Sequence, residues 1–181
     1  MQSDVQDDAP QKFVIDTDCL NHLLAHPSGR IVLKNVIIAI PPTIFNDLPG
    51  KGQEILKKVA RVEIVELDMD DKVYASKIVR KINQKKEYED WYLQGRKLRE
   101  IKHLGECEGA AIAKRLNVDF VMLDRNARAV IKIAFKHISV KTIDLVEFGR
   151  NILDESGNGN HSAEFENEMN KRLHRYSKKS V

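Results

Sequence analysis

The sequence predicts an α/β protein built on a central, mostly parallel sheet, and three observations support this class. Apolar runs of strand length alternate with segments of helical spacing through most of the chain. The run VIIAIP at 36–41 shows no polar alternation, as expected of a strand buried on both faces of a parallel sheet. The 181 residues, 42% of them hydrophobic, suffice for one core and are too few for two ordinary domains.

The first half of the chain contains three predicted strands. FVID at 13–16 is rich in strand formers and ends on an acid, and TDCLNHLLAH at 17–26 has apolar residues at helical spacing until PSGR breaks the pattern. The run at 36–41 is the second strand. A brief helix in PPTIFNDLPG and a longer one in KGQEILKKVA precede the third strand, VEIVEL at 62–67.

The second half begins with a charged stretch, 70–103, whose composition predicts two solvent-facing helices inserted into the α/β pattern. The alternation then resumes. We expect helix, strand, helix, strand and helix at 105–116, 117–124, 125–135, 137–142 and 143–153.

The sequence predicts three parts along the chain. Residues 1–11 are polar and acidic and are expected to be a disordered N-terminal segment, and 12–153 are expected to form the α/β domain. DESGNGNHSA predicts a flexible linker, so 154–181 is expected to be a linker followed by a basic amphipathic tail. Within the tail, apolar residues recur at helical spacing opposite lysines and arginines.

Composition excludes several classes of protein. Cys19 and Cys107 have no paired spacing, so neither a disulfide framework nor a zinc knuckle is indicated. No signal-like start and no run long enough to span a bilayer is present, which favours a cytoplasmic protein without a membrane partner. HExxH pairs, a Ser-His-Asp order and a phosphate-cradling glycine loop are also absent.

Four acids are placed so that they could converge. Asp16, Asp47 and Asp124 lie at or just beyond the ends of predicted strands, where an open parallel sheet binds its ligands. Glu106 begins a helix whose Gly109, Ala110 and Ala113 would allow close approach to the sheet. Asp16 and Asp124 could instead each cap the helix that follows them.

A cluster of carboxylates favours one chemistry. Such a group is stable only when it shares a proton or binds a hard cation, and oxygen ligands suit Mg²⁺ or Mn²⁺. A magnesium ion held by few carboxylates keeps waters, activates one of them and stabilises the charge that develops on a phosphodiester. Phosphodiester hydrolysis is therefore the expected reaction.

Three segments resemble the PIN-domain family. FVIDTDCL (13–20) is similar to the opening of these domains, in which an aspartate ends the first strand. GECEGAAIAKRLNVDFVMLDRNAR (105–128) resembles their second half, and IPPTIFNDLPG (40–50) their middle segment, where relatives more often carry glutamate than aspartate. The resemblance covers roughly 13–142, apart from the charged stretch.

The resemblance implies a three-layer α/β/α PIN-like fold and a metal-dependent nuclease. The implied ligands of Mg²⁺ or Mn²⁺ are Asp16, Asp47, Glu106 and Asp124. Glu108 is an alternative to Glu106, and Thr17 is a hydrogen-bond donor to a carboxylate or phosphate. Asn126 stands where relatives often carry another acid, which would weaken metal binding or confine it to one ion.

The charged stretch suits contact with single-stranded RNA, because cations and aromatic rings are interleaved in it. The residues expected to bind RNA are Lys81, Lys85, Lys86, Trp91, Arg96, Lys97 and Arg99. The alternative is a solvated helical face with its aromatic rings packed inward.

The resulting functional hypothesis is an endoribonuclease, either the toxin of a toxin–antitoxin pair or an RNA-processing enzyme. RNA, an antitoxin or other protein partner, and a second copy of the chain are its expected partners. The alternative is a non-catalytic RNA-binding or protein-interaction module on a PIN fold, weakened at its metal site by Asp47 and Asn126. Cleavage of DNA is a third hypothesis, because metal-assisted hydrolysis does not itself select the sugar.

Overall fold

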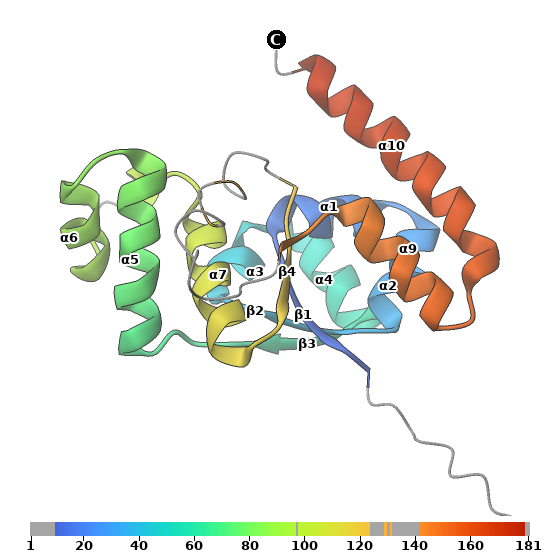
Figure 1. The fold of residues 1–181 in the computed structure, drawn as a ribbon, viewed down its shortest axis with the longest axis horizontal. Helices are drawn as coiled ribbons and strands as arrows, with labels where there is room; N and C mark the ends of the chain where they lie inside the picture. Colours follow the sequence, from blue (N-terminus) through green and yellow to red (C-terminus); the bar gives the residue numbers. More distant parts are fainter. Residues whose placement is uncertain (1–9, 97, 124–128, 130, 132–141, 180–181) are drawn as a thin grey trace, which may run out of the picture.

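The computed structural model describes residues 10–96, 98–123, 129, 131 and 142–179. Within this part of the chain, a five-stranded parallel sheet has the order β3-β2-β1-β4-β5 (Figure 1). Its strands are β1 (Lys12–Ile15), β2 (Ile37–Ile40), β3 (Arg61–Ile64), β4 (Asp119–Val121) and β5 (Thr142–Ile143). The order runs outward from β1 in both directions, so a topological switch point lies between β1 and β4.

Helices cover both faces of the sheet, which gives three layers (Figure 1). One face is covered by α1 (Thr17–Ala25), α2 (Pro27–Lys34), α4 (Gly50–Val59) and α9 (Leu145–Glu155). The other face is covered by α7 (Leu104–Leu116), with α5 (Met69–Asn83) and α6 (Glu87–Leu93) outside it. The short α3 (Pro42–Asp47) follows β2 at the carboxyl edge of the sheet and packs on α7. The predicted α/β class is confirmed.

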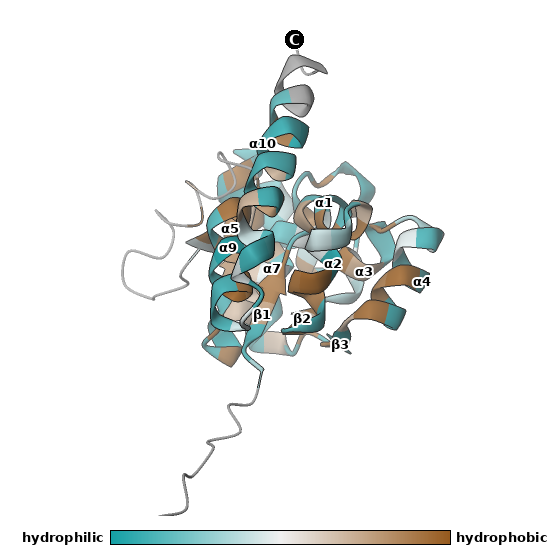
Figure 2. Ribbon diagram, turned by 90° about the vertical axis from the view of Figure 1, so that its right-hand side faces the viewer, coloured by the Kyte–Doolittle hydropathy of each residue, from teal (hydrophilic) through white to brown (hydrophobic). Residues whose placement is uncertain are grey.

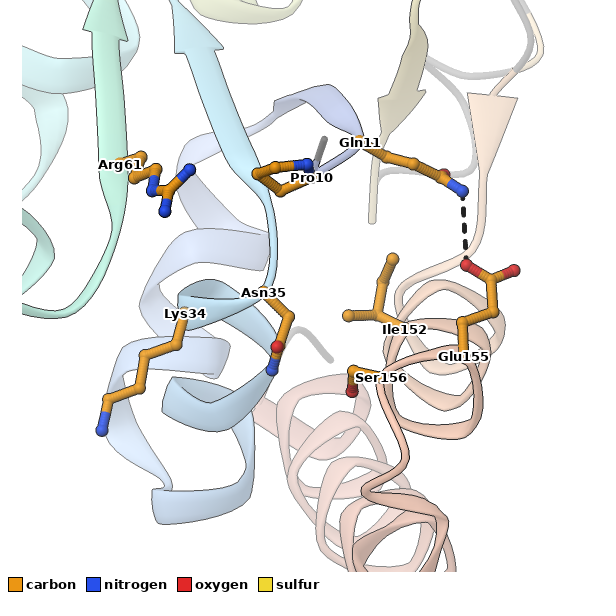
Figure 3. A pocket seen from close by; sticks show the side chains of 8 residues that line it. All are labelled: Pro10, Gln11, Lys34, Asn35, Arg61, Ile152, Glu155 and Ser156. Carbon is orange, nitrogen blue, oxygen red and sulfur yellow. Dashed lines mark hydrogen bonds between the residues drawn. The ribbon is translucent and has the colours of Figure 1, made fainter. Parts of the chain in front are cut away.

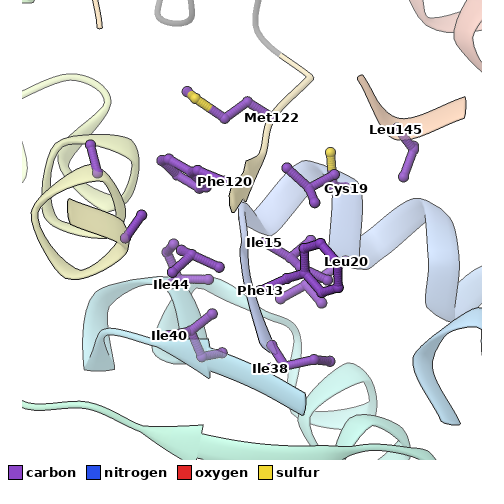
Figure 4. Close-up of a cluster of buried hydrophobic side chains, with 14 of the residues drawn as sticks. Phe13, Ile15, Cys19, Leu20, Ile38, Ile40, Ile44, Phe120, Met122 and Leu145 are labelled. Atoms are coloured by element: carbon purple, nitrogen blue, oxygen red, sulfur yellow. The ribbon is translucent and has the colours of Figure 1, made fainter. Parts of the chain in front are cut away.

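The core lies between these layers, and close packing of α7 is one of its determinants (Figure 4). Phe13 of β1 packs edge-on against Phe148 of α9, with ring centroids 4.9 Å apart. Phe120 of β4 faces α7, where a Cβ added to Gly109 would lie only 2.7 Å from the phenyl ring. Glycine at 109 therefore lets α7 approach the sheet, as the small residues of this helix predicted.

Several predicted boundaries shift. β1 begins and ends one residue earlier than predicted, so Asp16 follows the strand, and β3 covers 61–64 where 62–67 was expected. PSGR does break the first helix, but it also begins a second one that sequence reasoning missed. Pro27 occupies the first turn of α2, where its missing N–H costs nothing, and the His26 ring caps the helix.

The charged insertion forms the two predicted helices, α5 and α6, followed by the 3₁₀ turn η1 (Leu98–Glu100). The insertion faces solvent on one side and is also anchored to the rest of the domain. Ala75, Ile78 and Val79 of α5 are buried, and α5 packs along α7. The insertion is thus an additional layer fixed to the helix that carries Glu106.

The C-terminal part differs from the expected linker and tail. After α9 comes the 3₁₀ turn η2 (Gly159–His161), and α10 (Ser162–Lys179) then packs along α9 and α2. Phe165 and Met169 are fully buried, although α10 is largely hydrophilic in Figure 2. Because these two side chains complete the core beside α9, α10 belongs to the body of the domain.

Two predicted elements fall mostly outside the described residues, namely the helix at 125–135 and the strand at 137–142. Near this point the structure describes the strand β5. The helix α9 begins two residues after residue 143, where the last helix of the domain was expected to start. In the described part of the chain, no helix combines the length and apolar character needed to cross a membrane.

Candidate active site at the carboxyl edge of the sheet

Asp16 lies at the topological switch point, directly after β1. Its Oδ1 accepts a hydrogen bond from the backbone N–H of Cys19 at 2.7 Å, and its Oδ2 accepts one from the N–H of Leu123 at 3.0 Å. Asp16 therefore caps α1, as the structural alternative predicted, and also joins the ends of β1 and β4. Burial raises the pKa of Asp16 to about 6, with a contribution from the charge of Glu106, while the N–H donors oppose this shift.

An acidic pocket of about 220 Å³ opens beside Asp16. Its lining residues come from α1, α3 and α7 and are Thr17, Asp18, Ile44, Asp47 and Glu106. Three of the five carry carboxylates, and the lining contains no lysine or arginine. The pocket thus brings together Asp47, Glu106 and Thr17 of the predicted site, whereas the buried Asp16 is not among its lining residues.

The approach of α3 to α7 depends on a second glycine. A Cβ added to Gly105 would lie 3.1 Å from Ile44 and 4.0 Å from Oδ2 of Asp47. Gly105 therefore lets the start of α7 come close to the end of α3. The carboxylates of Asp47 and Glu106, from segments far apart in the sequence, face the same pocket as a result.

Glu106 and Glu108 have different environments although both lie on α7. The Glu106 side chain is about one-fifth exposed and contacts Nδ1 of His103 through Oε1 at 3.1 Å. Glu108 is buried, and its carboxylate accepts hydrogen bonds from the hydroxyls of Thr43 at 2.5 Å and Tyr92 at 2.9 Å. Burial raises the pKa of Glu108, and these two hydroxyls oppose the rise. Glu106 is therefore the pocket residue, while Glu108 holds α3 and α6 to α7.

Asp18 was not among the residues predicted for the site. It is exposed in the first turn of α1 and lines the pocket with Asp47 and Glu106. The signal was present in the sequence as the Asp-Thr-Asp spacing of residues 16–18, which puts a second acid two residues after Asp16.

The pocket has suitable donors for a hard cation, but not a complete set among the described residues. All its acidic donors are carboxylate oxygens, which suit Mg²⁺ and Mn²⁺. Within the described part of the chain, no three acidic, histidine or cysteine side chains lie close enough together to hold an ion directly. Asp124 and Asn126 lie outside the described residues, although Leu123, which precedes Asp124, is hydrogen-bonded to Asp16. The donors fit a hydrated ion, because Mg²⁺ usually keeps several waters.

A groove of about 580 Å³ adjoins the acidic pocket and shares Asp18, Asp47 and Glu106 with it. The rest of its lining comes from the end of the insertion and the start of α7. The residues of this second wall are Leu98, Arg99, Ile101, His103, Leu104 and Gly105. The acids are therefore open on one side to a larger channel.

The residues expected to bind RNA are not gathered in one place. Lys81, Lys85, Lys86, Arg96 and Arg99 are exposed, while Lys97 lies outside the described residues. Trp91 is only half-buried, but it packs on Tyr88 with ring centroids 4.9 Å apart, and Tyr88 and Tyr92 are buried. The tyrosine rings thus pack inward, as the alternative reading of the insertion predicted. Of the candidate cations, Arg99 is the one that lines the groove beside the acids.

A second pocket lies at the opposite, amino edge of the sheet (Figure 3). It measures about 670 Å³ and is lined by Pro10, Gln11, Lys34, Asn35, Arg61, Ile152, Glu155 and Ser156. Its single acid, Glu155, accepts a hydrogen bond from the Gln11 side chain at 3.3 Å. Two cations and a single acid provide no cluster of carboxylates that requires a metal.

Comparison with known proteins leaves the site to be interpreted on its own geometry. No family model matches the chain, and no curated protein or solved structure is significantly similar to it. The three-layer arrangement and the position of the acids are therefore the basis on which a function is proposed.

Proposed function

We propose that this chain is a metal-dependent endoribonuclease of the PIN type. The observation that carries the proposal is the acidic pocket, which Asp18, Asp47 and Glu106 line next to the buried Asp16 without a lysine or arginine among its described lining residues. Carboxylates that line one small pocket repel one another, and a hard cation relieves that repulsion. The pocket also lies at the switch point, where open parallel sheets bind ligands.

In this proposal the acids hold Mg²⁺ or Mn²⁺, with Asp16, Asp47, Glu106 and Asp124 as the ligand set. The bound ion would supply an activated water and neutralise charge on the phosphodiester. Asp16 is oriented by its two N–H donors, and the His103 ring limits the rotation of Glu106. Thr17 lines the same pocket, where its hydroxyl can donate to a phosphate oxygen.

A single-stranded nucleic acid is the proposed substrate because a groove adjoins the acids. Among the described residues that line this groove, Arg99 is the only lysine or arginine. A single strand can carry a phosphodiester to the acids with its bases unpaired. The choice of RNA over DNA follows the resemblance to PIN domains.

A second candidate is a non-catalytic RNA-binding module on the same fold. Two observations favour it. Both oxygens of Asp16 already accept backbone N–H groups, and the described residues contain no complete three-donor metal cluster. This module would bind RNA equally well with or without divalent metal and would not cut it.

The test is cleavage of labelled single-stranded RNA, structured RNA and single-stranded DNA in Mn²⁺, Mg²⁺ or EDTA. The wild type is compared with Glu106→Gln, with Asp124→Asn, and with Glu54→Gln, a matched control at an exposed acid of α4. RNA cleavage that needs metal, survives in Glu54→Gln and is lost in the other two variants supports the nuclease. Intact RNA that is nevertheless bound by the wild type supports the non-catalytic module, and cleavage of DNA alone would change the substrate.

A further inference from the structure

The wall of the groove that the insertion contributes is firmly built. Asn83 at the end of α5 holds it through two hydrogen bonds, because its side-chain amide donates to the carbonyl of Lys102 at 3.2 Å and its oxygen accepts from the N–H of Lys102 at 3.0 Å. Ile101, one residue earlier, is buried. The segment 98–102 therefore has a defined position relative to α5.

The connection from α6 to this wall is held in the same way. Tyr92, in the last turn of α6, donates its hydroxyl proton to the buried Glu108 of α7. After α6 the chain turns through Gly95, whose φ of +67° suits glycine, and the N–H of Arg96 bonds to the carbonyl of Trp91 at 2.7 Å. Both ends of the segment that carries η1 are thus fixed to the body of the domain.

The side chains of this wall differ in character from the acids that line the same groove. Arg99 is exposed, and no ion pair joins it to another described residue. Leu98 is 40% exposed and lines the groove, and Leu104 adds further apolar surface to it. The groove therefore has an anionic wall, formed by the three acids, and a wall from the insertion, which offers aliphatic surface and one guanidinium without an ion pair to a described residue.

These two walls match the chemistry of a polynucleotide strand, which alternates phosphates with flat, largely apolar rings. A guanidinium binds phosphate oxygens through paired N–H donors. An exposed aliphatic side chain beside it offers contact area to an unpaired base. A protein loop or an acidic peptide would supply neither the spaced phosphates nor the rings.

We propose that Arg99 and Leu98 form a subsite for the nucleotide next to the scissile phosphodiester of a single strand. This inference rests on the proposed nuclease function, because the acidic pocket is taken as the site of the scissile phosphate. Arg99 contacts the neighbouring phosphate and Leu98 the base attached to it. The subsite thereby sets the direction in which the strand lies across the acids.

The test is equilibrium binding of a fluorescent eight-nucleotide single-stranded RNA, measured by anisotropy at several salt concentrations. Ca²⁺ is used as the divalent ion because it takes the same oxygen ligands, and a gel checks that the probe stays intact. The variants are Arg99→Ala, Arg99→Glu and Leu98→Ala. Lys102→Glu is the control, because its side chain is exposed nearby but does not line the groove.

Each variant has its own expected signature. Arg99→Ala should reduce the slope of log Kd against log salt by about 0.7, the value for one phosphate contact in a single strand. Arg99→Glu should weaken binding at least tenfold, roughly the scale of a lost and reversed phosphate contact. Leu98→Ala should weaken binding roughly threefold with an unchanged slope, and a probe with abasic sites should remove that difference.

The outcomes separate the subsite from the proposed function. If Arg99→Glu and Lys102→Glu weaken binding equally, or if Leu98→Ala has no effect, the subsite is overturned while metal-dependent cleavage by the wild type would still stand. If the expected slopes appear but the wild type never cuts RNA, the contacts of Arg99 and Leu98 with the strand stand, while the nuclease proposal, and with it the place of these contacts next to a scissile phosphodiester, fails. The same series with single-stranded DNA shows whether the subsite distinguishes the sugar.

Discussion

The two edges of the sheet carry pockets of opposite character. At the carboxyl edge, a pocket of about 220 Å³ contains three carboxylates without a basic residue in its lining. At the amino edge, a pocket about three times larger, at 670 Å³, contains Lys34, Arg61 and a Glu155 that is already hydrogen-bonded. The smaller cavity has the unbalanced charge. The difference shows that volume alone is a poor guide to chemistry in this fold.

Strand polarity explains why the edges differ. In a parallel sheet all carboxyl ends meet at one edge, so the acid that ends β1 and the acids carried by α3 and α7 can converge there. At the amino edge the chain enters β2 and β3 from helix ends, where Lys34 is the last residue of α2, Asn35 caps that helix, and Arg61 begins β3 shortly after α4. Positive side chains suit such helix ends without any ligand.

The largest expected effect contrasts one acid from each edge. Glu106→Gln should lower metal-dependent RNA cleavage by at least about 100-fold, the scale for loss of one electrostatic contact to a transition state. Glu155→Gln, the same substitution at the amino edge, should change it less than twofold. Initial rates with a labelled RNA in Mn²⁺ measure both. Equal loss in the two variants would place the reaction somewhere other than the acidic pocket.

The second prediction concerns pH and the buried Asp16. Burial raises its pKa from an ordinary value of 3.8 to about 6, so the folded state binds this proton more tightly than the unfolded state does. Metal-free wild type should therefore lose up to about 3 kcal/mol of stability from this group as the pH rises from 4 to 7. The Asp16→Asn variant lacks this titrating carboxyl group.

Denaturant unfolding of both proteins in EDTA measures this difference. The stability of the wild type relative to Asp16→Asn should fall as the pH rises, whatever constant offset the amide introduces. A parallel pH dependence in the two proteins would mean that Asp16 is already ionised near pH 4 and that burial does not perturb it.

The sequence was sufficient for the framework of the site but not for its details. Apolar runs ending on acids predicted the carboxyl-edge cluster, because strand polarity is fixed by the alternation of strands and helices. The choice between Glu106 and Glu108 stayed open, since both lie near the start of one helix. Only packing decides it, because Tyr92 from the insertion and Thr43 from α3 both reach Glu108.

The same limit applies to the fold. The strands were found because their apolar runs are continuous, whereas α2 was missed because PSGR has the composition of a turn. The C-terminal helix was expected to be separate because its linker is rich in glycine and asparagine. Burial of Phe165 and Met169 is a tertiary contact that local composition does not encode.

The third prediction tests how the insertion supports the carboxyl edge. Tyr92→Phe removes the hydroxyl that donates to the buried Glu108 and should lower the free energy of unfolding by about 1–2 kcal/mol. The substitution leaves the acidic pocket intact, so Mn²⁺ should raise the Tm of the variant as much as that of the wild type. A variant that unfolds normally but no longer responds to Mn²⁺ would show that Glu108 takes part in the metal site.

The smallest expected effect is at the amino edge, and it tests whether the larger pocket has a part in the reaction. Arg61 is exposed at the start of the edge strand β3, so Arg61→Ala should change stability by less than about 0.5 kcal/mol, as is usual for surface substitutions. RNA cleavage should change less than twofold, because the proposed RNA site lies at the other edge of the sheet. A selective loss of RNA binding in Arg61→Ala, with normal unfolding, would instead extend the RNA path across the sheet and remove the contrast between its two edges.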